Sequence, residues 1–420
     1  MSAGDALCFA PERGLVPVAE VDRRLAALAR PPVRTERVPL AQALGRILAA
    51  PLRAPRDVPA FDNVAVDGWA FAAASLSADG PTRLAILPGR AAAGHPFPDP
   101  VPAGFAVQAL TGAPMPAGTD TVAMWEECRV EGDTLVVPAG FRAFANRRRA
   151  GEDIRAGAIV FHEGTRLGPQ HLGIAAELGA AELEVFAPLR VALVSSGDEL
   201  LEPGAPFRPG AVYDANRTML RALLARLPCV VTDLGILPDD AARVRRALRE
   251  AAASHDLVLS SAGASKSAED HLARTVAEEG ALAFWQIAMK PGRPFAAGTL
   301  GSAIYVALPG NPVAAAVCFL RFARPFLLAL AGAPFAPPRP VPLPAAFSFR
   351  KGPGRTELLR ARLVHREDGS VAVERIPREG SGILTSLGEA DGLAEIAAER
   401  TRVEPGELVP FYALSALGCG

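Results

Sequence analysis

The sequence predicts a multidomain protein in which a mostly parallel α/β sheet is combined with β-rich domains. The chain has 420 residues, more than one ordinary core would hold, so about three or four domains are expected. From residue 190 onward, short apolar runs alternate with helical stretches of roughly 10–15 residues, the pattern of a parallel sheet with crossover helices. Residues 61–144 and those after 342 hold short apolar runs between Gly and Pro clusters, which is typical of β structure.

Two stretches near the N-terminus have helical spacing. Residues 17–30 place apolar side chains on one face and end at two prolines, and residues 38–50 show a similar pattern. A third helix is expected at Pro169–Leu178, after the β-rich segment. It could rejoin the first two, in which case the β-rich segment is an insertion into a helical domain.

The α/β part has the most regular alternation. We expect its strands at residues 191–196, 229–235, 256–261 and 283–289, followed by two more. We expect its helices at residues 214–227, 239–253, 270–279 and 312–330, with Asp239 or Asp240 at an N-cap position. A Pro-rich linker at residues 332–342 then leads to a compact β domain.

Composition excludes several classes of function. The formal net charge is −1, so no overall field would attract nucleic acid or an anionic membrane. The five cysteines are scattered without a CxxC pair, which argues against a disulfide framework or a structural zinc site. No basic leader precedes an apolar run, and no uninterrupted apolar segment reaches the roughly 18–20 residues of a membrane span. We therefore expect a cytoplasmic protein.

Two polar turns follow expected strands of the α/β part. Residues 195–199 read Ser-Ser-Gly-Asp-Glu, and residues 260–265 read Ser-Ser-Ala-Gly-Ala-Ser with Asp270 closing the loop. Small residues let backbone N–H groups approach a phosphate, and a carboxylate beside them can hold a metal ion. Each turn alone also fits an ordinary loop with a capping Asp, so both interpretations stay open.

The turn Lys290-Pro-Gly-Arg293-Pro carries two cations on a stiff backbone. Such a pair suits a small polyvalent oxyanion, although a solvated surface turn fits equally well. Residues 308–312 bring a Gly next to an expected helix start, where anions also bind. Asp67 and Asp153 lie in distant polar turns and alone would be turn formers. The combination, without a nucleophile–histidine set, indicates metal-assisted chemistry on an anionic, phosphorylated ligand.

Together these stretches resemble the molybdopterin molybdenumtransferase family, the molybdenum-insertion enzymes related to the gephyrin E domain. The resemblance runs in the family's order over essentially the whole chain. The matching pieces are FDNVAVDGWA (Phe61–Ala70), LTGAP (Leu110–Pro114), RRRAGEDI (Arg147–Ile154), ALVSSGDEL (Ala192–Leu200), YDANR (Tyr213–Arg217), SSAGAS…ED (Ser260–Asp270), MKPGRPF (Met289–Phe295) and LPGNPV (Leu308–Val313).

The resemblance implies a fold and a reaction. The implied domains are a helical elongated domain (1–56 and 146–188), an inserted β-rich domain (57–145), a central molybdopterin-binding α/β domain (189–332) and a C-terminal β-barrel (333–420). The implied enzyme is a homodimer that takes adenylylated molybdopterin and molybdate, inserts molybdenum and releases AMP with the help of Mg²⁺. Client molybdoenzymes are possible further partners.

The resemblance also implies roles for single residues. The catalytic residues would be Asp67, Asp153, Glu199, Asp270 and Lys290. The metal would be held by Glu199, Asp239 and Asp270. The substrates would be bound by Thr111, Ser196, Gly197, Asp239, Ser261, Gly263, Ser265, Arg293, Asn311, Arg355, Arg360 and Ser381, of which Arg293, with Lys290 and a C-terminal Arg such as Arg355 or Arg360, would clamp molybdate.

The sequence departs from the family pattern in the first phosphate turn. Ala262 stands where the family usually has Gly, Lys266–Ser267 where it has Val-Gly, and Gln286 where a Lys is frequent. The alternative is therefore that this chain is a divergent, non-catalytic member that acts as a carrier or scaffold for the molybdenum cofactor. A related adenylyltransferase is a third possibility, but it would not need the additional N- and C-terminal domains.

Overall fold

The computed structural model describes residues 14–30, 32, 34–263, 271–378 and 380–419. The chain divides into two compact units. The α/β unit comprises Met1–Ala49, Gly164–Gly168 and Glu182–Gly420, and the β unit comprises Ala50–Glu163 and Pro169–Ala181. The four predicted domain ranges stay predictions.

A six-stranded sheet forms the centre of the α/β unit, in the order β16-β13-β17-β21-β20-β18. Its first four strands are parallel neighbours, whereas β20 is antiparallel to both β21 and β18. The alternation of strands and helices agrees with the sequence prediction. The strands are β13 (Leu189–Ser196), β16 (Cys229–Leu237), β17 (Leu257–Ser261), β18 (Gly280–Trp285), β20 (Ala296–Leu300) and β21 (Ala303–Leu308).

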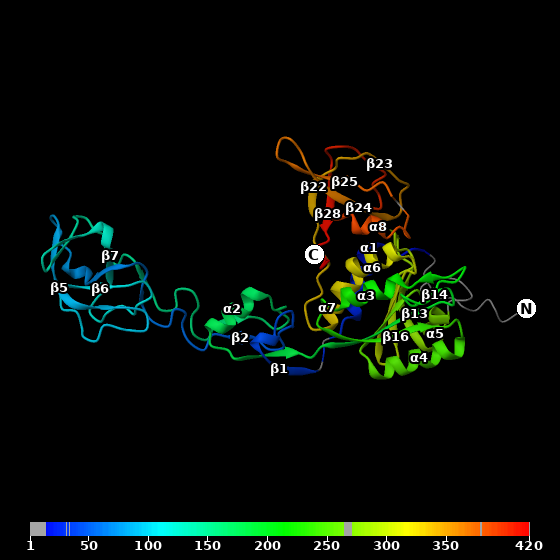
Figure 1. Cartoon of the computed structure of the whole chain (residues 1–420), viewed down its shortest axis with the longest axis horizontal. Coiled ribbons are helices and arrows are strands. Elements are labelled where there is room, and N and C mark those ends of the chain that lie inside the picture. The colour runs from blue at the N-terminus through cyan, green and yellow to red at the C-terminus, as the bar shows by residue number, and fades with distance from the viewer. Residues whose placement is uncertain (1–13, 31, 33, 264–270, 379, 420) are drawn as a thin grey trace, which may run out of the picture. The chain divides into compact units, whose positions relative to one another are not determined.

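Helices cover both faces of this sheet (Figure 1). Alternate side chains of each buried strand point to opposite faces, so Val191 and Leu193 join one core while Ala192 and Val194 join the other. On the first face lie α1 (Val18–Leu28), α3 (Ala215–Leu224), α6 (Pro312–Cys318) and α7 (Arg324–Leu330), and on the second lie α4 (Ala241–Ser254) and α5 (His271–Glu279). Asp240, and not Asp239, caps α4 by accepting the backbone N–H of Arg243 at 2.8 Å.

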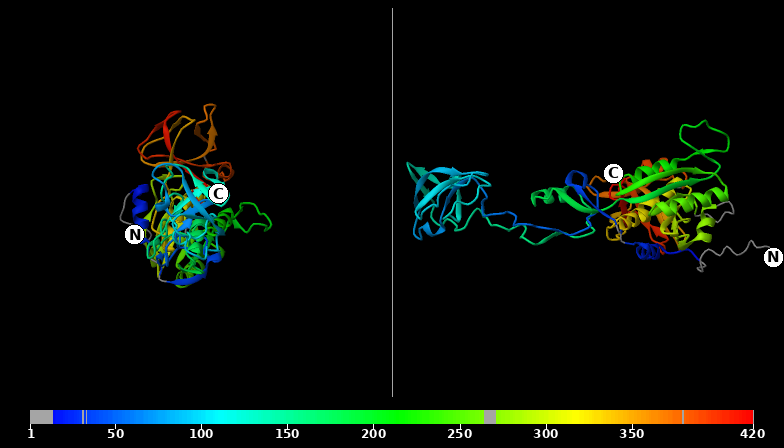
Figure 2. Two further views of the ribbon diagram at one scale, coloured as in Figure 1. Left: turned by 90° about the vertical axis from the view of Figure 1, so that its left-hand side faces the viewer. Right: turned by 90° about the horizontal axis from the view of Figure 1, so that it is seen from below.

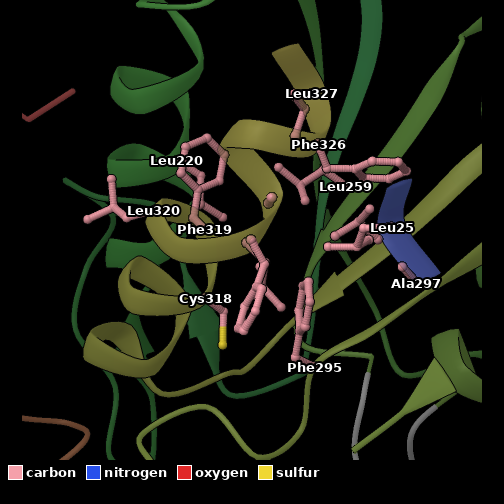
Figure 3. Packing of buried hydrophobic residues seen from close by; sticks show 14 of the residues in the cluster. Leu25, Leu220, Leu259, Phe295, Ala297, Cys318, Phe319, Leu320, Phe326 and Leu327 are labelled. Atoms are coloured by element: carbon pink, nitrogen blue, oxygen red, sulfur yellow. The ribbon is translucent and has the colours of Figure 1, made fainter. Parts of the chain in front are cut away.

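One long core helix continues from α6 through the π-helical turn η4 (Phe319–Ala323) into α7. Its 19 residues, Pro312–Leu330, are long and apolar enough by length and composition to cross a membrane, although Arg321 and Arg324 interrupt the apolar run, as the sequence prediction requires. However, 89% of its most apolar window is buried inside the protein. Phe319, Phe326 and Leu327 of this helix belong to the same core as Leu25 of α1 and Leu259 of β17 (Figure 3).

The predicted helix at residues 38–50 is absent. Thr35–Pro39 forms strand β1, antiparallel to β12 (Glu182–Phe186), and only the short 3-10 turn η1 (Leu40–Gln42) follows. Leu48 bridges Val185, which continues the extended path. Backbone pairing with β12 therefore overrides the helical spacing, as tertiary context does with weak local propensity.

A second six-stranded sheet lies at the C-terminal end of the α/β unit, in the order β19-β24-β26-β28-β22, with β25 paired to β24. Its first strand, β19 (Met289–Lys290), comes from the central segment, so the predicted strand 283–289 is split between two sheets. The others are β22 (Val341–Pro344), β24 (Thr356–His365), β25 (Val371–Arg375), β26 (Gly392–Ile396) and β28 (Leu408–Ala413), near which α8 (Thr385–Gly388) and the pair β23 (Phe349–Arg350) and β27 (Arg402–Val403) are found.

The β unit contains its own six-stranded sheet, β7-β4-β6-β5-β9-β8, which can be followed in cyan in Figures 1 and 2. Its strands are β4 (Gly68–Phe71), β5 (Thr82–Ala91), β6 (Phe105–Ala109), β7 (Thr121–Met124), β8 (Arg129–Glu131) and β9 (Thr134–Val137). The β-rich character predicted for residues 61–144 is thus present. The short pairs β3 (Asn63–Val64) with β10 (Arg147–Arg148) and β2 (Leu52–Arg53) with β11 (Ile159–Phe161) precede helix α2 (Pro169–Glu177).

Candidate active site

A cavity of about 270 Å³ lies in the α/β unit, where β19, the start of the core helix and the C-terminal sheet meet. We call it the cationic pocket, because five basic side chains line it. These are Lys290, Arg293, Arg355, Arg360 and Arg375. Asn311 and Ser381 also line it, so the structure brings together six residues predicted from separate motifs: Lys290, Arg293, Asn311, Arg355, Arg360 and Ser381.

The turn from Lys290 to Arg293 packs closely against buried side chains of the core. Gly292 has φ +114°, and a Cβ added there would overlap the buried sulfur of Cys318 and lie 2.8 Å from the Met289 methyl group. Only Gly fits this position without displacing the core. The Arg293 guanidinium donates two hydrogen bonds to Oε1 of Gln286, at 3.2 Å and 3.0 Å. Gln286, the residue found where the resemblance leads us to expect a Lys, therefore orients Arg293.

Lys290 has a partner that sequence reasoning missed. Its Nζ lies 3.2 Å from Oε2 of Glu357, a carboxylate with only 7% of its residue surface exposed. The parallel pairing of β19 with β24 sets the two residues directly opposite each other. Glu357 and Arg375 both line the pocket. Because side chains alternate along a strand, the sequence could have predicted that Glu357 shares a face with Arg355. The register in which β19 pairs with β24, however, leaves no signal in the local sequence.

The other side of the pocket is fixed by buried polar contacts. Arg360 is 5% exposed, and its Nε donates to Oγ of Ser386 at 3.1 Å. The carbonyl of Ser381 accepts the N–H of Val313 at 3.0 Å, which ties this loop to the start of the core helix. Asn311 precedes that helix but makes no side-chain cap hydrogen bond, so capping does not occupy its amide.

A second polar region lies at the carboxyl ends of β13 and β16. Oγ of Ser196 donates to Asp239 at 3.3 Å, and the N–H of Asp198 donates to the same carboxylate at 3.3 Å. Gly197 has φ +149°, and a Cβ there would clash with the carboxylate of Glu199. The predicted residues Ser196, Gly197, Glu199 and Asp239 are therefore gathered at this strand end.

The turn after β17 continues the same sheet edge. Ala262 has φ +80° and Gly263 has φ +89°, so the chain adopts two successive left-handed residues although only the second is Gly. A Cβ on Gly263 would lie 2.7 Å from the hydroxyl of Tyr305. Ser265 and Asp270, with the departures Lys266 and Ser267, lie outside the described residues.

Asn216 connects this edge to the cationic pocket. Its Nδ2 donates to Oγ of Ser261 at 2.9 Å and to the carbonyl of Gly310 at 2.6 Å, and Gly310 itself lines the pocket. The Oδ1 atom of Asn216 is buried without a hydrogen-bond partner in the protein. A buried acceptor of this kind needs a donor from water or a ligand. Asn216 was not among the predicted site residues, although it lies in the quoted YDANR motif.

Two predicted residues of the β unit form a pair of their own. Oδ1 of Asp67 accepts the N–H and the hydroxyl of Thr111, both at 2.7 Å. The hydroxyl bond and then the backbone bond lower the pKa of Asp67 below its ordinary value. Asp153 lies in an exposed turn, where its N–H donates to the carbonyl of Val58 at 3.1 Å. No hydrogen bond between described residues joins Asp153 to the Asp67–Thr111 pair.

The sheet edge offers ligands of the kind that Mg²⁺ prefers. Carboxylate and hydroxyl oxygens are hard donors, and Glu199, Asp239 and Ser196 supply them at one strand end. Among the residues that the structure describes, there is no cluster of three or more His, Cys, Asp or Glu side chains suited to a metal ion. The third predicted carboxylate, Asp270, lies outside the described residues. The donor chemistry of Glu199, Asp239 and Ser196 therefore fits Mg²⁺.

Comparison with known proteins agrees with this architecture. Residues 16–179 match the family described as MoeA N-terminal region (domain I and II), residues 192–329 a probable molybdopterin binding domain, and residues 342–414 the MoeA C-terminal region (domain IV). The MoeA-like multidomain arrangement of mixed sheets and helices is thereby supported along the chain.

Individual relatives extend over nearly the whole chain. The molybdopterin molybdenumtransferase of Haemophilus influenzae is 36% identical over 380 residues, which cover 90% of this chain and 93% of that protein. The enzyme of the same name from Synechococcus elongatus is 33% identical over 404 residues, covering 94% and 98%. The crystal structure of the molybdopterin biosynthesis moeA protein from Pyrococcus horikoshii matches with a TM-score of 0.81 at 28% identity, covering 95% of this chain and 100% of that chain. The chain therefore belongs to the molybdopterin molybdenumtransferase (MoeA) family.

Proposed function

We propose that this molybdenumtransferase binds molybdate in the cationic pocket and transfers the molybdenum to adenylylated molybdopterin held along the adjoining sheet edge, with release of AMP. The observation that carries the proposal is the convergence of Lys290, Arg293, Arg355 and Arg360 on one cavity from separate segments. A site that gathers several cations, a hydroxyl and an amide suits a compact dianion, because charge-assisted hydrogen bonds can reach it from several directions.

The sheet edge is the proposed place of the substrate's phosphate groups. Backbone N–H groups in successive left-handed residues form an anion-binding turn, as at Ala262 and Gly263. Asn216 reaches from this edge to the pocket wall, so both substrates would lie within one connected site. Mg²⁺, when held by Glu199, Asp239 and Asp270, would neutralise charge on the phosphate oxygens during cleavage of the phosphoanhydride.

Further parts of the proposal rest on the family resemblance. Asp67 and Asp153 are proposed to act in catalysis and Thr111 in substrate binding, as the resemblance implies. The protein is proposed to act as a homodimer in the cytoplasm and to deliver its product to client molybdoenzymes.

The experiment is a single-turnover reaction of the purified protein with adenylylated molybdopterin, Mg²⁺ and molybdate. We expect AMP release that depends on molybdate, together with molybdenum bound to the pterin. Lys290→Ala should abolish the molybdate dependence. Arg362→Ala is the matched control, because Arg362 is exposed, pairs with Glu374 and does not line the pocket. Binding of the molybdenum cofactor without AMP release would favour the carrier function, and equal rates in both variants would refute the site.

A further inference from the structure

We infer that Glu357 is a catalytic residue that moves protons during insertion, taking them from the thiols of the pterin and giving them to the oxygen that leaves molybdate. This inference rests on the proposed function, since it needs molybdate and the dithiol in the cationic pocket. Glu357 lies outside the sequence motifs that carry the family resemblance.

The position of Glu357 is the first argument. Its side chain lines the same cavity as Lys290 and Arg293, the cavity in which we propose that molybdate binds. Among the lining residues that the structure describes, it is the only carboxylate. An anion-binding cavity gains nothing in affinity from a fixed negative charge, which repels the ligand. Its presence there therefore suggests a chemical task.

The second argument is the way the carboxylate is held. Oε2 lies 3.2 Å from Nζ of Lys290, and the β19–β24 register sets both residues on adjacent strands. The residue is 7% exposed, so bulk water has little access to it. A buried carboxylate needs a partner, and the partner is a residue of the clamp itself. Binding of an oxyanion at Lys290 would thus act directly on Glu357.

The chemistry of insertion requires proton transfer. One dithiol and one molybdate give a dithiolene-bound trioxomolybdenum dianion and one water: R(SH)₂ + MoO₄²⁻ → R(S)₂MoO₃²⁻ + H₂O. Two Mo–S bonds form and one Mo–O bond breaks. Both thiol protons end in the water, and molybdenum stays in its highest oxidation state, so no oxidant or reductant is needed. Ionised Glu357 can accept each proton from sulfur and pass it to the departing oxygen.

Other charged groups around Glu357 are basic. Lys290 comes from β19, Arg355 precedes β24, Arg375 ends β25, and Lys351 of the preceding loop lies close enough to interact electrostatically with Glu357. The neighbouring strand β26 pairs with Glu357 through Ile396. Its Glu395 is engaged by the hydroxyl of Tyr412 at 2.9 Å. The carboxylate therefore lies among cations that also contact the bound oxyanion, which places it beside the reacting groups.

A merely structural role would give a different result. If Glu357 only positions Lys290, its loss should weaken molybdate binding and leave the rate at saturating molybdate unchanged. If it transfers protons, its loss should lower the saturated rate. Removal of one negative charge should leave molybdate affinity equal or higher.

The test compares the wild type with Glu357→Gln, Glu357→Asp and the control Glu374→Gln. Glu374 is an exposed carboxylate on the adjacent strand that pairs with Arg362 and does not line the pocket. Molybdate affinity is measured by titration calorimetry on the protein alone. Insertion is followed as AMP release and pterin-bound molybdenum at saturating molybdate across a pH series.

We expect Glu357→Gln to lower the saturated rate by about 100-fold without weakening molybdate binding, since positioned proton transfer contributes roughly 10²–10⁴-fold. A step that needs a carboxylate as proton acceptor slows at acidic pH, so the wild-type rate should fall there and Glu357→Gln should lose this pH dependence. Glu357→Asp should keep it. An unchanged rate, or a loss of affinity alone, would overturn the inference. If Glu357→Gln does not fold, a wild-type rate without an acidic limb overturns it equally. No molybdate-dependent AMP release in the wild type would instead reject the proposed function.

Discussion

Replacing Gly292 by Ala tests how the molybdate clamp is built. An Ala there must hold φ +114° and place its Cβ on the sulfur of Cys318. The strained backbone costs about 1–3 kcal/mol. Overpacking of the buried contact costs about 1–3 kcal/mol more. We therefore expect Gly292→Ala to lower the free energy of unfolding of the α/β unit by roughly 2–6 kcal/mol, and to weaken molybdate binding, because the turn carries Lys290 and Arg293.

The assay isolates the α/β unit by fluorescence. The chain has three tryptophans, of which Trp69 and Trp125 lie in the β unit and Trp285 in β18. In a background with the first two changed to Phe, urea unfolding monitored at Trp285 reports the α/β unit alone. Molybdate affinity is measured on the same proteins.

A second change separates the two contributions. Cys318→Ala removes the sulfur but leaves the backbone of residue 292 as it is. In the Gly292→Ala background it should recover about 1–3 kcal/mol, the part that comes from overpacking. The reasoning is refuted if Gly292→Ala is as stable as its parent, or if Cys318→Ala destabilises both backgrounds equally.

Three further predictions concern the same unit. Arg217→Ala should lower the free energy of unfolding by about 3–5 kcal/mol in urea, because Asp214, 3% exposed, loses its buried partner; a change below about 1 kcal/mol would contradict this. Ala262→Gly should raise the free energy of unfolding by about 0.5–1 kcal/mol, because relief of left-handed strain, roughly 1–2 kcal/mol, exceeds the entropy gained by the unfolded chain. A loss of stability would contradict this prediction. For Asp256, burial favours the protonated form, but hydrogen bonds from Arg190 outweigh it and hold the pKa below its ordinary value. Its stabilisation is therefore complete above about pH 4 and lost as the pH falls further, so wild type and Asp256→Asn should converge in stability on acidification.

The elements that sequence could predict are those with strong local signals. Strand β13 and helix α4 follow from an uninterrupted apolar run and from an Asp at an N-cap, and both are present. The turn from Lys290 to Arg293 was predicted as an oxyanion clamp, and the structure places both cations on one cavity. Such features depend on neighbouring residues in the chain, which sequence shows directly.

The features that sequence could not predict depend on distant pairing. Residues 38–50 have helical spacing, yet pairing of Thr35–Pro39 with β12 holds the preceding residues extended. Glu357 and Arg375 reach the pocket through the register of β19, β24 and β25, which no local pattern specifies. Asn216 connects two turns more than forty residues away along the chain. Such contacts appear only when the sheet is assembled.

The central claim is that molybdate binds in the cationic pocket, and anomalous X-ray scattering from molybdenum tests it most directly. Crystals of the wild type and of Lys290→Ala would be soaked in molybdate and measured at the molybdenum absorption edge. We predict an anomalous peak bounded by Lys290, Arg293, Arg355 and Arg360 in the wild type, and its loss in the variant. A peak that lies elsewhere, or one that persists unchanged in Lys290→Ala, would contradict the assignment of the pocket.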